Sequence, residues 1–221
     1  MALREHDFVE IEYTGKIKES GEVFDTTDAK VAKEHGIFDK AALFGPVTVC
    51  LGEGFVLHGL EERLIGKELG EHDIDLTAEE GFGKKSAKLI QLVPTAKFTK
   101  QEIVPTPGLQ INVDGMLGTV RTVTGGRTIV DFNHPLSGKE LLYKVKILRS
   151  VTDEQEKANA ILKWLFRIPN AELKLEDKKL TIIFEQMPQE FQQEIANKVK
   201  QLTKITEIVF EDRPAKQAKW A

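Results

Sequence analysis

Apolar and polar residues alternate along much of the first 150 positions, and a period of two is typical of half-buried strands. The alternation is clearest at residues 8–13, where every second side chain is apolar. The ranges that carry this pattern are 8–18, 23–25, 47–51, 71–76 and 141–148. They predict a sheet-rich domain.

A single helix is expected within this region. Between residues 54 and 64, apolar side chains recur at helical spacing, and Gly66 favours an end to the helix. Residues 28–42 are polar and irregular, so we expect an extended loop or bulge there, with a turn at 34–36.

A second group of strands interrupts the pattern between residues 84 and about 132. Its strand signals are 88–93, 109–113, 116–123 and 127–132, and the last two are separated by a Gly125-Gly126 turn typical of a hairpin. We therefore expect a small β-rich module inserted into the parent domain.

The pattern changes again after Ser150. A helix is expected from a cap at Thr152 or Asp153, a hairpin over 172–184, a helix from Pro188, and a strand over 205–210 before a polar tail at 212–221. The order α-β-β-α-β predicts a small C-terminal α+β domain.

Composition narrows the choice of function. The chain has 221 residues, 41% hydrophobic and 30% charged, with a net charge of −4 that argues against nucleic-acid binding. One cysteine allows no internal disulfide, and five dispersed histidines predict no metal site. No run reaches the roughly 18 apolar residues of a membrane span, and the charged start lacks the core of a signal peptide. We expect a cytoplasmic protein without membrane partners.

Four short strings in fixed order suggest what the chain does. They are V-E-I-E-Y-T at 9–14, G-E-V-F-D-T at 21–26, L-G-E-G-F-V-L-H-G-L at 51–60 and N-H-P-L-S-G-K at 133–139. Together they resemble the FKBP-type peptidyl-prolyl cis/trans isomerases. The insert resembles the insert-in-flap module of the SlyD-like chaperone branch, and the overall architecture resembles the long archaeal members of the family. The resemblance implies an FKBP-like antiparallel half-barrel with a short helix. It also implies an isomerase domain at 1–83 and 133–150, a chaperone module at 84–132, and a C-terminal α+β domain of unassigned role at 151–221.

The resemblance also implies a set of catalytic residues. Position by position, these are Tyr13, Phe24, Asp25, Val56, Leu57, Leu60, Phe82 and Tyr143. Leu60 replaces the family's frequent tryptophan, and Phe82 replaces a frequent tyrosine. Without the motifs, helical spacing alone would assign Val56, Leu57 and Leu60 to core packing. For Val47 and Val49 core packing is the favoured interpretation.

Rotation about an X-Pro bond requires no nucleophile and no cofactor. Amide resonance sets a barrier of about 18–20 kcal/mol, and a dry apolar pocket favours the twisted, less polar state. We therefore expect no cofactor, and unfolded or partly folded chains with X-Pro bonds as partners.

The insert adds apolar side chains that predict a binding surface for unfolded chains. These are Leu92, Val93, Phe98, Ile103, Leu109, Ile111, Met116, Val120 and Val123. For any one of them, a place in the core of the module is an equal alternative. Self-association through the C-terminal domain is a further expectation, and a chaperone with a vestigial isomerase pocket is the rival function.

Overall fold

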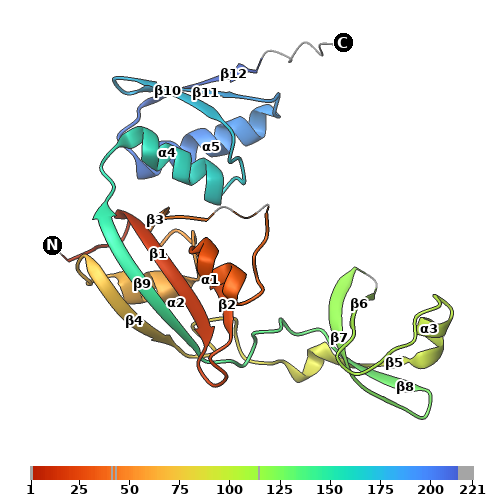
Figure 1. Cartoon of the computed structure of the whole chain (residues 1–221). Coiled ribbons are helices and arrows are strands. Elements are labelled where there is room, and N and C mark those ends of the chain that lie inside the picture. The colour runs from red at the N-terminus through yellow and green to blue at the C-terminus, as the bar shows by residue number, and fades with distance from the viewer. Residues whose placement is uncertain (1, 41, 43, 114, 214–221) are drawn as a thin grey trace, which may run out of the picture. The chain divides into compact units, whose positions relative to one another are not determined.

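A computed structural model describes residues 2–40, 42, 44–113 and 115–213 (Figure 1). The described residues form two compact units. The first contains residues 2–16, 21–75 and 142–213, and the second contains Ile17–Ser20 and Leu76–Leu141. The mixed α+β fold with mainly antiparallel sheets confirms the predicted fold class.

Five strands build the half-barrel. They are β1 (Phe8–Ile17), β2 (Val23–Thr26), β3 (Val47–Cys50), β4 (Gly70–Leu76) and β9 (Leu141–Ser150). The strand order in the sheet is β2-β1-β9-β4. Strand β3 also pairs with β1, along residues 8–11, whereas β2 pairs with residues 14–16 of β1. Buried residues alternate along β1 and β9, so one face of the sheet forms the core with helix α2 (His58–Leu64).

Two predictions for this region were wrong in detail. The segment expected to be a loop contains helix α1 (Ala29–Glu34), because the Asp28 carboxylate caps it by accepting hydrogen bonds from the backbone N–H of Lys30 and Val31. Helix α2 begins at His58, not at Gly54. Residues 54–57 form a turn before it, and the buried pair Leu60 and Leu64 carries the apolar face.

The insert contains a four-stranded sheet in the order β5-β8-β7-β6. Its elements are η1 (Ala87–Leu89), β5 (Ile90–Pro94), α3 (Thr95–Thr99), β6 (Gln110–Val113), β7 (Met116–Thr124) and β8 (Arg127–Asp131). The predicted hairpin is confirmed: Gly125 and Gly126 have φ of 53° and 78° between paired strands β7 and β8. Helix α3 was not predicted.

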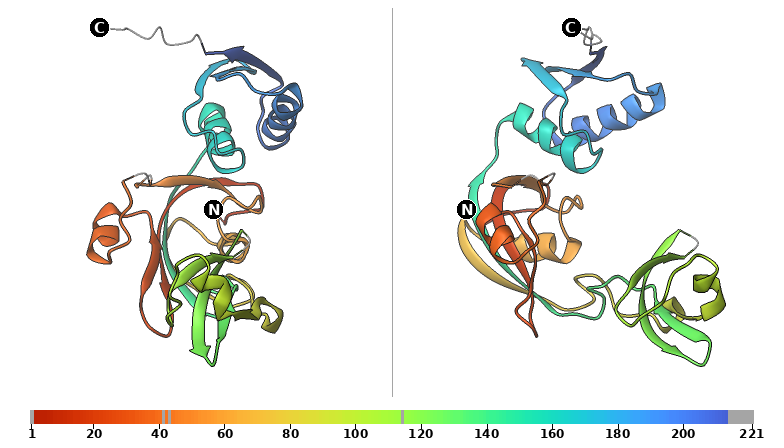
Figure 2. Two further views of the ribbon diagram at one scale, coloured as in Figure 1. Left: turned by 90° about the vertical axis from the view of Figure 1, so that its right-hand side faces the viewer. Right: turned by 45° about the vertical axis from the view of Figure 1, so that its right-hand side comes forward.

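The C-terminal segment has the predicted order α-β-β-α-β. Its elements are α4 (Glu154–Trp164), β10 (Glu172–Glu176), β11 (Lys179–Phe184), α5 (Gln189–Leu202) and β12 (Glu207–Asp212). Strand β11 pairs antiparallel with β10 and parallel with β12, and both helices lie on the same face of this sheet (Figure 2). Asp153 caps α4 through the Glu156 N–H. The polar tail predicted at 212–221 falls, from 214 on, outside the described residues. The proposed domain boundaries stay predictions.

No helix among the described residues is long and apolar enough to cross a membrane.

Candidate active site

Three aromatic rings gather on the core face of the half-barrel. Tyr143 on β9 is 2% exposed, and its ring lies 5.7 Å from that of Phe24 in an edge-to-face arrangement. The Tyr13 ring lies 5.9 Å from Tyr143, on the neighbouring strand β1. The first and last strands of the half-barrel thus bring together residues that are 130 positions apart in the chain.

A glycine makes room for these rings. A Cβ on Gly15 would lie 2.8 Å from both the Phe24 and the Tyr143 ring carbons, which is closer than such atoms approach. Gly15, which directly follows the V-E-I-E-Y-T string, is therefore needed for packing of the aromatic side chains, since any larger residue would displace them.

Asp25 extends the cluster toward solvent. The Tyr13 hydroxyl donates a hydrogen bond to Asp25 Oδ2 at 3.1 Å. Desolvation, followed by the nearby Asp25 charge, raises the pKa of Tyr13, so its hydroxyl stays protonated and keeps donating. Desolvation also raises the pKa of Asp25, although the hydrogen bond from Tyr13 opposes that shift.

The turn that holds Val56 is anchored by a buried carboxylate that the sequence analysis missed. Glu61, on α2, is 0% exposed. One of its oxygens accepts from the N–H of Gly52 and Gly54 at 3.0 and 2.9 Å, and the other from Phe55 and Val56 at 2.6 and 3.0 Å. Its position, four residues after Leu57 and three before Leu64, was a usable signal, because a charge on an apolar helix face must find partners.

The other expected residues occupy different surroundings. Leu60 is 1% exposed, and Val47 and Val49 are buried at 6% and 0%, as the core interpretation predicts for the two valines. Phe82 belongs to the second unit, where its ring stacks on His134 at 4.3 Å and its carbonyl accepts from Ser137 Oγ. The catalytic roles of Leu60 and Phe82 stay predictions.

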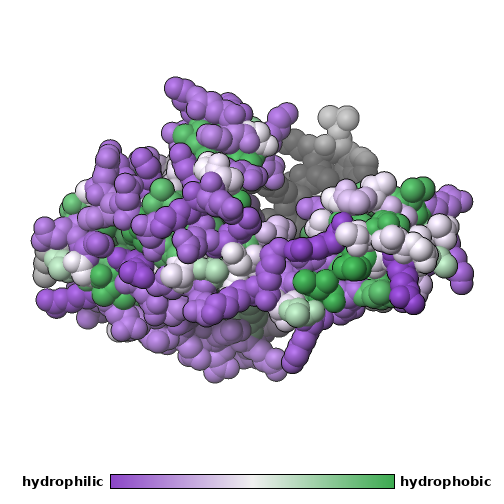
Figure 3. Space-filling view, turned by 90° about the horizontal axis from the view of Figure 1, so that it is seen from below, coloured by the Kyte–Doolittle hydropathy of each residue, from purple (hydrophilic) through white to green (hydrophobic). Residues whose placement is uncertain are grey.

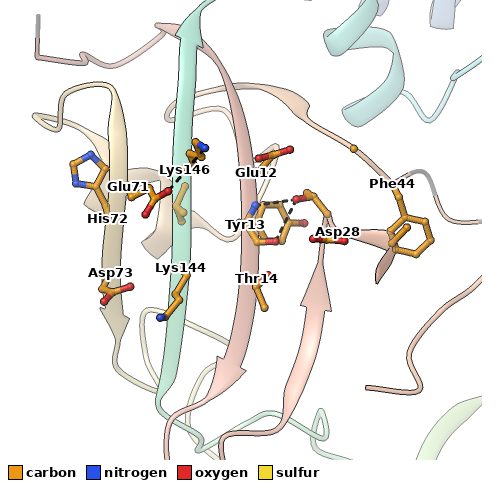
Figure 4. A pocket seen from close by; sticks show the side chains of 14 residues that line it. Glu12, Tyr13, Thr14, Asp28, Phe44, Glu71, His72, Asp73, Lys144 and Lys146 are labelled. Atoms are coloured by element: carbon orange, nitrogen blue, oxygen red, sulfur yellow. Dashed lines mark hydrogen bonds and ion pairs between the residues drawn. The ribbon is translucent and has the colours of Figure 1, made fainter. Parts of the chain in front are cut away.

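A hollow of about 840 Å³ lies on the opposite face of the same strands (Figure 4). Lys144 and Lys146 line it, and they alternate with Tyr143 along β9, so they point away from the aromatic cluster. Lys146 pairs with Glu71 at 3.9 Å. Tyr13 of the ring cluster also borders this hollow, but most of its lining is polar or charged, which suits rotation of an X-Pro amide less well than the packed rings do.

The apolar residues predicted for client binding divide between core and surface. Val93, Phe98, Ile111 and Val120 are buried in the core of the insert, and Ile103 and Leu109 pack against them. The four buried side chains cannot contribute to an open patch, and Ile103 and Leu109 are partly buried. Leu92, Met116 and Val123 are exposed at 56%, 46% and 36%, as are Leu117 and Ile129 at 60% and 36%.

A polar cluster links the two chain segments at the base of the insert, and we call it the neck: Ser86, Arg121, Asp131 and Asn133. Asn133 receives a hydrogen bond from the Ser86 N–H at 2.8 Å and donates to Asp131 Oδ1 at 2.7 Å. Arg121 donates to the other Asp131 oxygen at 2.6 Å. Asn133 of the N-H-P string is therefore a structural link.

We expect the neck to weaken in acid. Desolvation raises the pKa of Asp131, but hydrogen bonds from Asn133 and Arg121 outweigh it and lower the pKa to about 2. A lowered pKa stabilises the fold above the ordinary value of 3.8, and this contribution disappears as the pH falls through about 2. The protection of the insert amides, measured as exchange relative to the intrinsic rate at each pH, should therefore decrease from pH 5 to pH 2. The Asp131→Asn protein should show lower amide protection in the insert at pH 5 and a smaller change in protection as the pH falls. The control Glu102→Gln, at an exposed position, should show the same protection as wild type.

No group of histidine, cysteine, aspartate and glutamate residues that could hold a metal ion occurs in the described part of the chain.

Comparison with known proteins agrees with this geometry. Residues 1–99 match the family described as FKBP-type peptidyl-prolyl cis-trans isomerase, and residues 91–136 match the FKBP26 IF domain. A short-type peptidyl-prolyl cis-trans isomerase of Methanocaldococcus jannaschii is 32% identical over 146 residues, which is 66% of this chain and 92% of the relative. The isomerase SlyD of Aeromonas hydrophila is 34% identical over 66% of this chain and 65% of its own. An FKBP-type 16 kDa isomerase of Escherichia coli is 31% identical over 56% of this chain and 81% of its own. The chain belongs to the FKBP-type peptidyl-prolyl cis-trans isomerase family.

Proposed function

We propose that this isomerase acts on X-Pro bonds of unfolded polypeptides and holds those clients through its insert. The carrying observation is the ring cluster of Tyr13, Phe24 and Tyr143 with Asp25 at its edge. The full catalytic set comprises Tyr13, Phe24, Asp25, Val56, Leu57, Leu60, Phe82 and Tyr143.

The cluster supplies the environment that X-Pro rotation needs. In the twisted amide the nitrogen is pyramidal and the carbonyl is less polarised, so an apolar surface favours it over the planar amide. Packed rings also fix the orientation of a proline ring, which lowers the entropic cost of reaching the twisted state.

The turn before α2 offers a backbone donor for the client. Glu61 accepts the Val56 N–H, while the Leu57 N–H makes no hydrogen bond among the described residues. A client carbonyl is a suitable partner for the Leu57 N–H, and the anchored turn holds this donor in a fixed direction.

The insert presents apolar side chains on the open face of its sheet. Leu92 and Ile129 are directly paired across β5 and β8, so their side chains lie on one face, opposite the buried Val130. Leu117 precedes the inward-facing Gly118 on β7 and lies on the same open face. Hydrophobic surface also gathers at the right of Figure 3, where the insert lies. Surface of this kind is suited to weak contacts with unfolded chains.

Removal of the Asp25 carboxylate tests the catalytic proposal. Asp25→Ala should lower kcat/KM on short X-Pro peptides roughly tenfold, because it removes the partner of the Tyr13 hydroxyl and a group expected near the client carbonyl. Asp25→Asn retains a side-chain oxygen, so its kcat/KM should fall less than that of Asp25→Ala. Asp73→Ala, on the opposite face of the sheet, is the matched control. A folded Asp25→Ala enzyme with the wild-type rate would place the active site elsewhere. A full-length protein without any isomerase activity would favour the rival, non-catalytic chaperone.

Cytoplasmic location, an archaeal source, lack of nucleic-acid and membrane partners, and self-association through the C-terminal segment stay predictions.

A further inference from the structure

The insert carries a charge opposite to that of the rest of the chain. Residues 84–132 contain seven lysines and arginines but three acids, while the whole chain has 31 basic and 35 acidic residues. Asp131 pairs with Arg121 and with Lys85, so one of the three acids and two of the seven basic residues are engaged with one another. A positive field around this module attracts negatively charged partners.

Two of these basic residues border a groove in the insert. The groove has a volume of about 270 Å³ and is lined by Val93, Lys97, Phe98, Lys100, Gln101, Asn112 and Val113. Val93 belongs to β5 and Val113 to β6, which are the two edge strands, so the sheet curls until both edges and α3 contribute to one groove. Lys97 and Lys100 are exposed and make no ion pair among the residues that the structure describes.

The groove therefore combines an apolar floor, a free strand edge and two unpaired positive charges. An extended chain can add to an exposed sheet edge through its backbone, and its side chains then select among sequences. A floor of Val93, Phe98 and Val113 suits one apolar side chain, and an adjacent carboxylate can approach Lys97 or Lys100.

We infer that the insert selects unfolded segments in which apolar residues are flanked by aspartate or glutamate. This inference rests on the proposed holding of unfolded clients by the insert and names the sequence class that it favours. Basic segments with the same apolar residues bind less well, because the excess positive charge of the insert repels them.

The test uses labelled peptides that share one proline-free apolar core and differ only in flanking residues, which are acidic, neutral or basic. Fluorescence anisotropy with the full-length protein should show the acidic peptide binding roughly 3- to 30-fold more tightly than the basic one in low salt. The difference should shrink in 0.3 M salt, because exposed charges are screened. Lys97→Glu combined with Lys100→Glu should reverse the order of affinities.

A matched control is available on another short helix. Lys30→Glu with Lys33→Glu makes the same charge change at the same spacing on α1, outside the insert, and should leave the preference intact. Equal affinity for acidic and basic peptides would overturn the inference but leave client holding in place, whereas no binding of any peptide would remove the proposed client holding itself. If both double variants lose the preference for acidic peptides, that preference would stem from the net charge of the whole protein and not from Lys97 and Lys100. A single-stranded oligonucleotide that binds the insert more tightly than the acidic peptide would assign the basic groove to nucleic acid instead.

Discussion

Replacement of residues 84–132 by a short turn is expected to slow the catalysed refolding of a proline-limited protein about 100-fold. Isomerisation of short X-Pro peptides should stay within about twofold of the full chain, because the ring cluster lies outside the replaced segment. The large loss follows from effective concentration: weak holding by a tethered module keeps an unfolded chain near the catalytic residues, and this advantage is absent for a free peptide.

The neck makes the replacement structurally feasible. The Ser86 N–H lies 2.8 Å from Asn133 Oδ1, and the Gly138 N–H lies 2.8 Å from the Gly83 carbonyl. The two chain segments that enter and leave the insert are therefore adjacent, so a turn of a few residues can join them without straining the parent domain.

A second variant tests whether the exposed apolar side chains of the insert, and not only its presence in the chain, are needed to hold the client. Leu92→Ser, Leu117→Ser and Ile129→Thr together remove exposed apolar side chains, and the buried core of the module stays unchanged. This variant should approach the slow refolding of the shortened protein. If both variants refold the client as fast as wild type, the insert is not the client-holding element.

The strands could be predicted because the alternation of apolar and polar residues along each strand matches the alternation of buried and exposed side chains. On β9, Tyr143, Val145 and Ile147 are buried while Lys144 and Lys146 are exposed, and this alternation is visible in the sequence. The Gly125-Gly126 turn was equally local, since positive φ favours glycine at both positions.

Short helices and buried polar contacts could not be predicted in the same way. Helix α1 has six residues, too few for a clear helical period, and its Asp28 cap also resembles an ordinary turn residue. The start of α2 was placed too early because Phe55, Val56 and Leu57 fit helical spacing by chance. Their turn depends on Glu61, whose place on the apolar helix face shows that it needs partners but does not show which four backbone groups it binds.

Loss of the Glu61 carboxylate should cost about 3–5 kcal/mol of unfolding free energy, since Glu61→Ala leaves buried N–H donors without acceptors. Glu61→Gln should cost about 2–4 kcal/mol, because its amide NH₂ would face two backbone donors that now bind a carboxylate oxygen. Both variants should also release the turn that contains Val56, and isomerase activity on short peptides should fall at least tenfold at temperatures where the protein is still folded.

Glu62 on the same helix provides the matched control. Its side chain is 59% exposed and pairs with His58 at 3.2 Å, so Glu62→Gln should cost less than about 0.5 kcal/mol and preserve activity. Urea unfolding gives the free energies, and amide exchange at Phe55 and Val56 shows whether the turn has opened before global unfolding. We expect the Glu61→Gln protein to exchange faster at these two amides and to lose activity while it is still folded. Together these two results would identify Glu61 as the residue that positions the turn. A Glu61→Gln protein that matches Glu62→Gln in stability, exchange and rate would show instead that the turn holds its shape without the buried carboxylate.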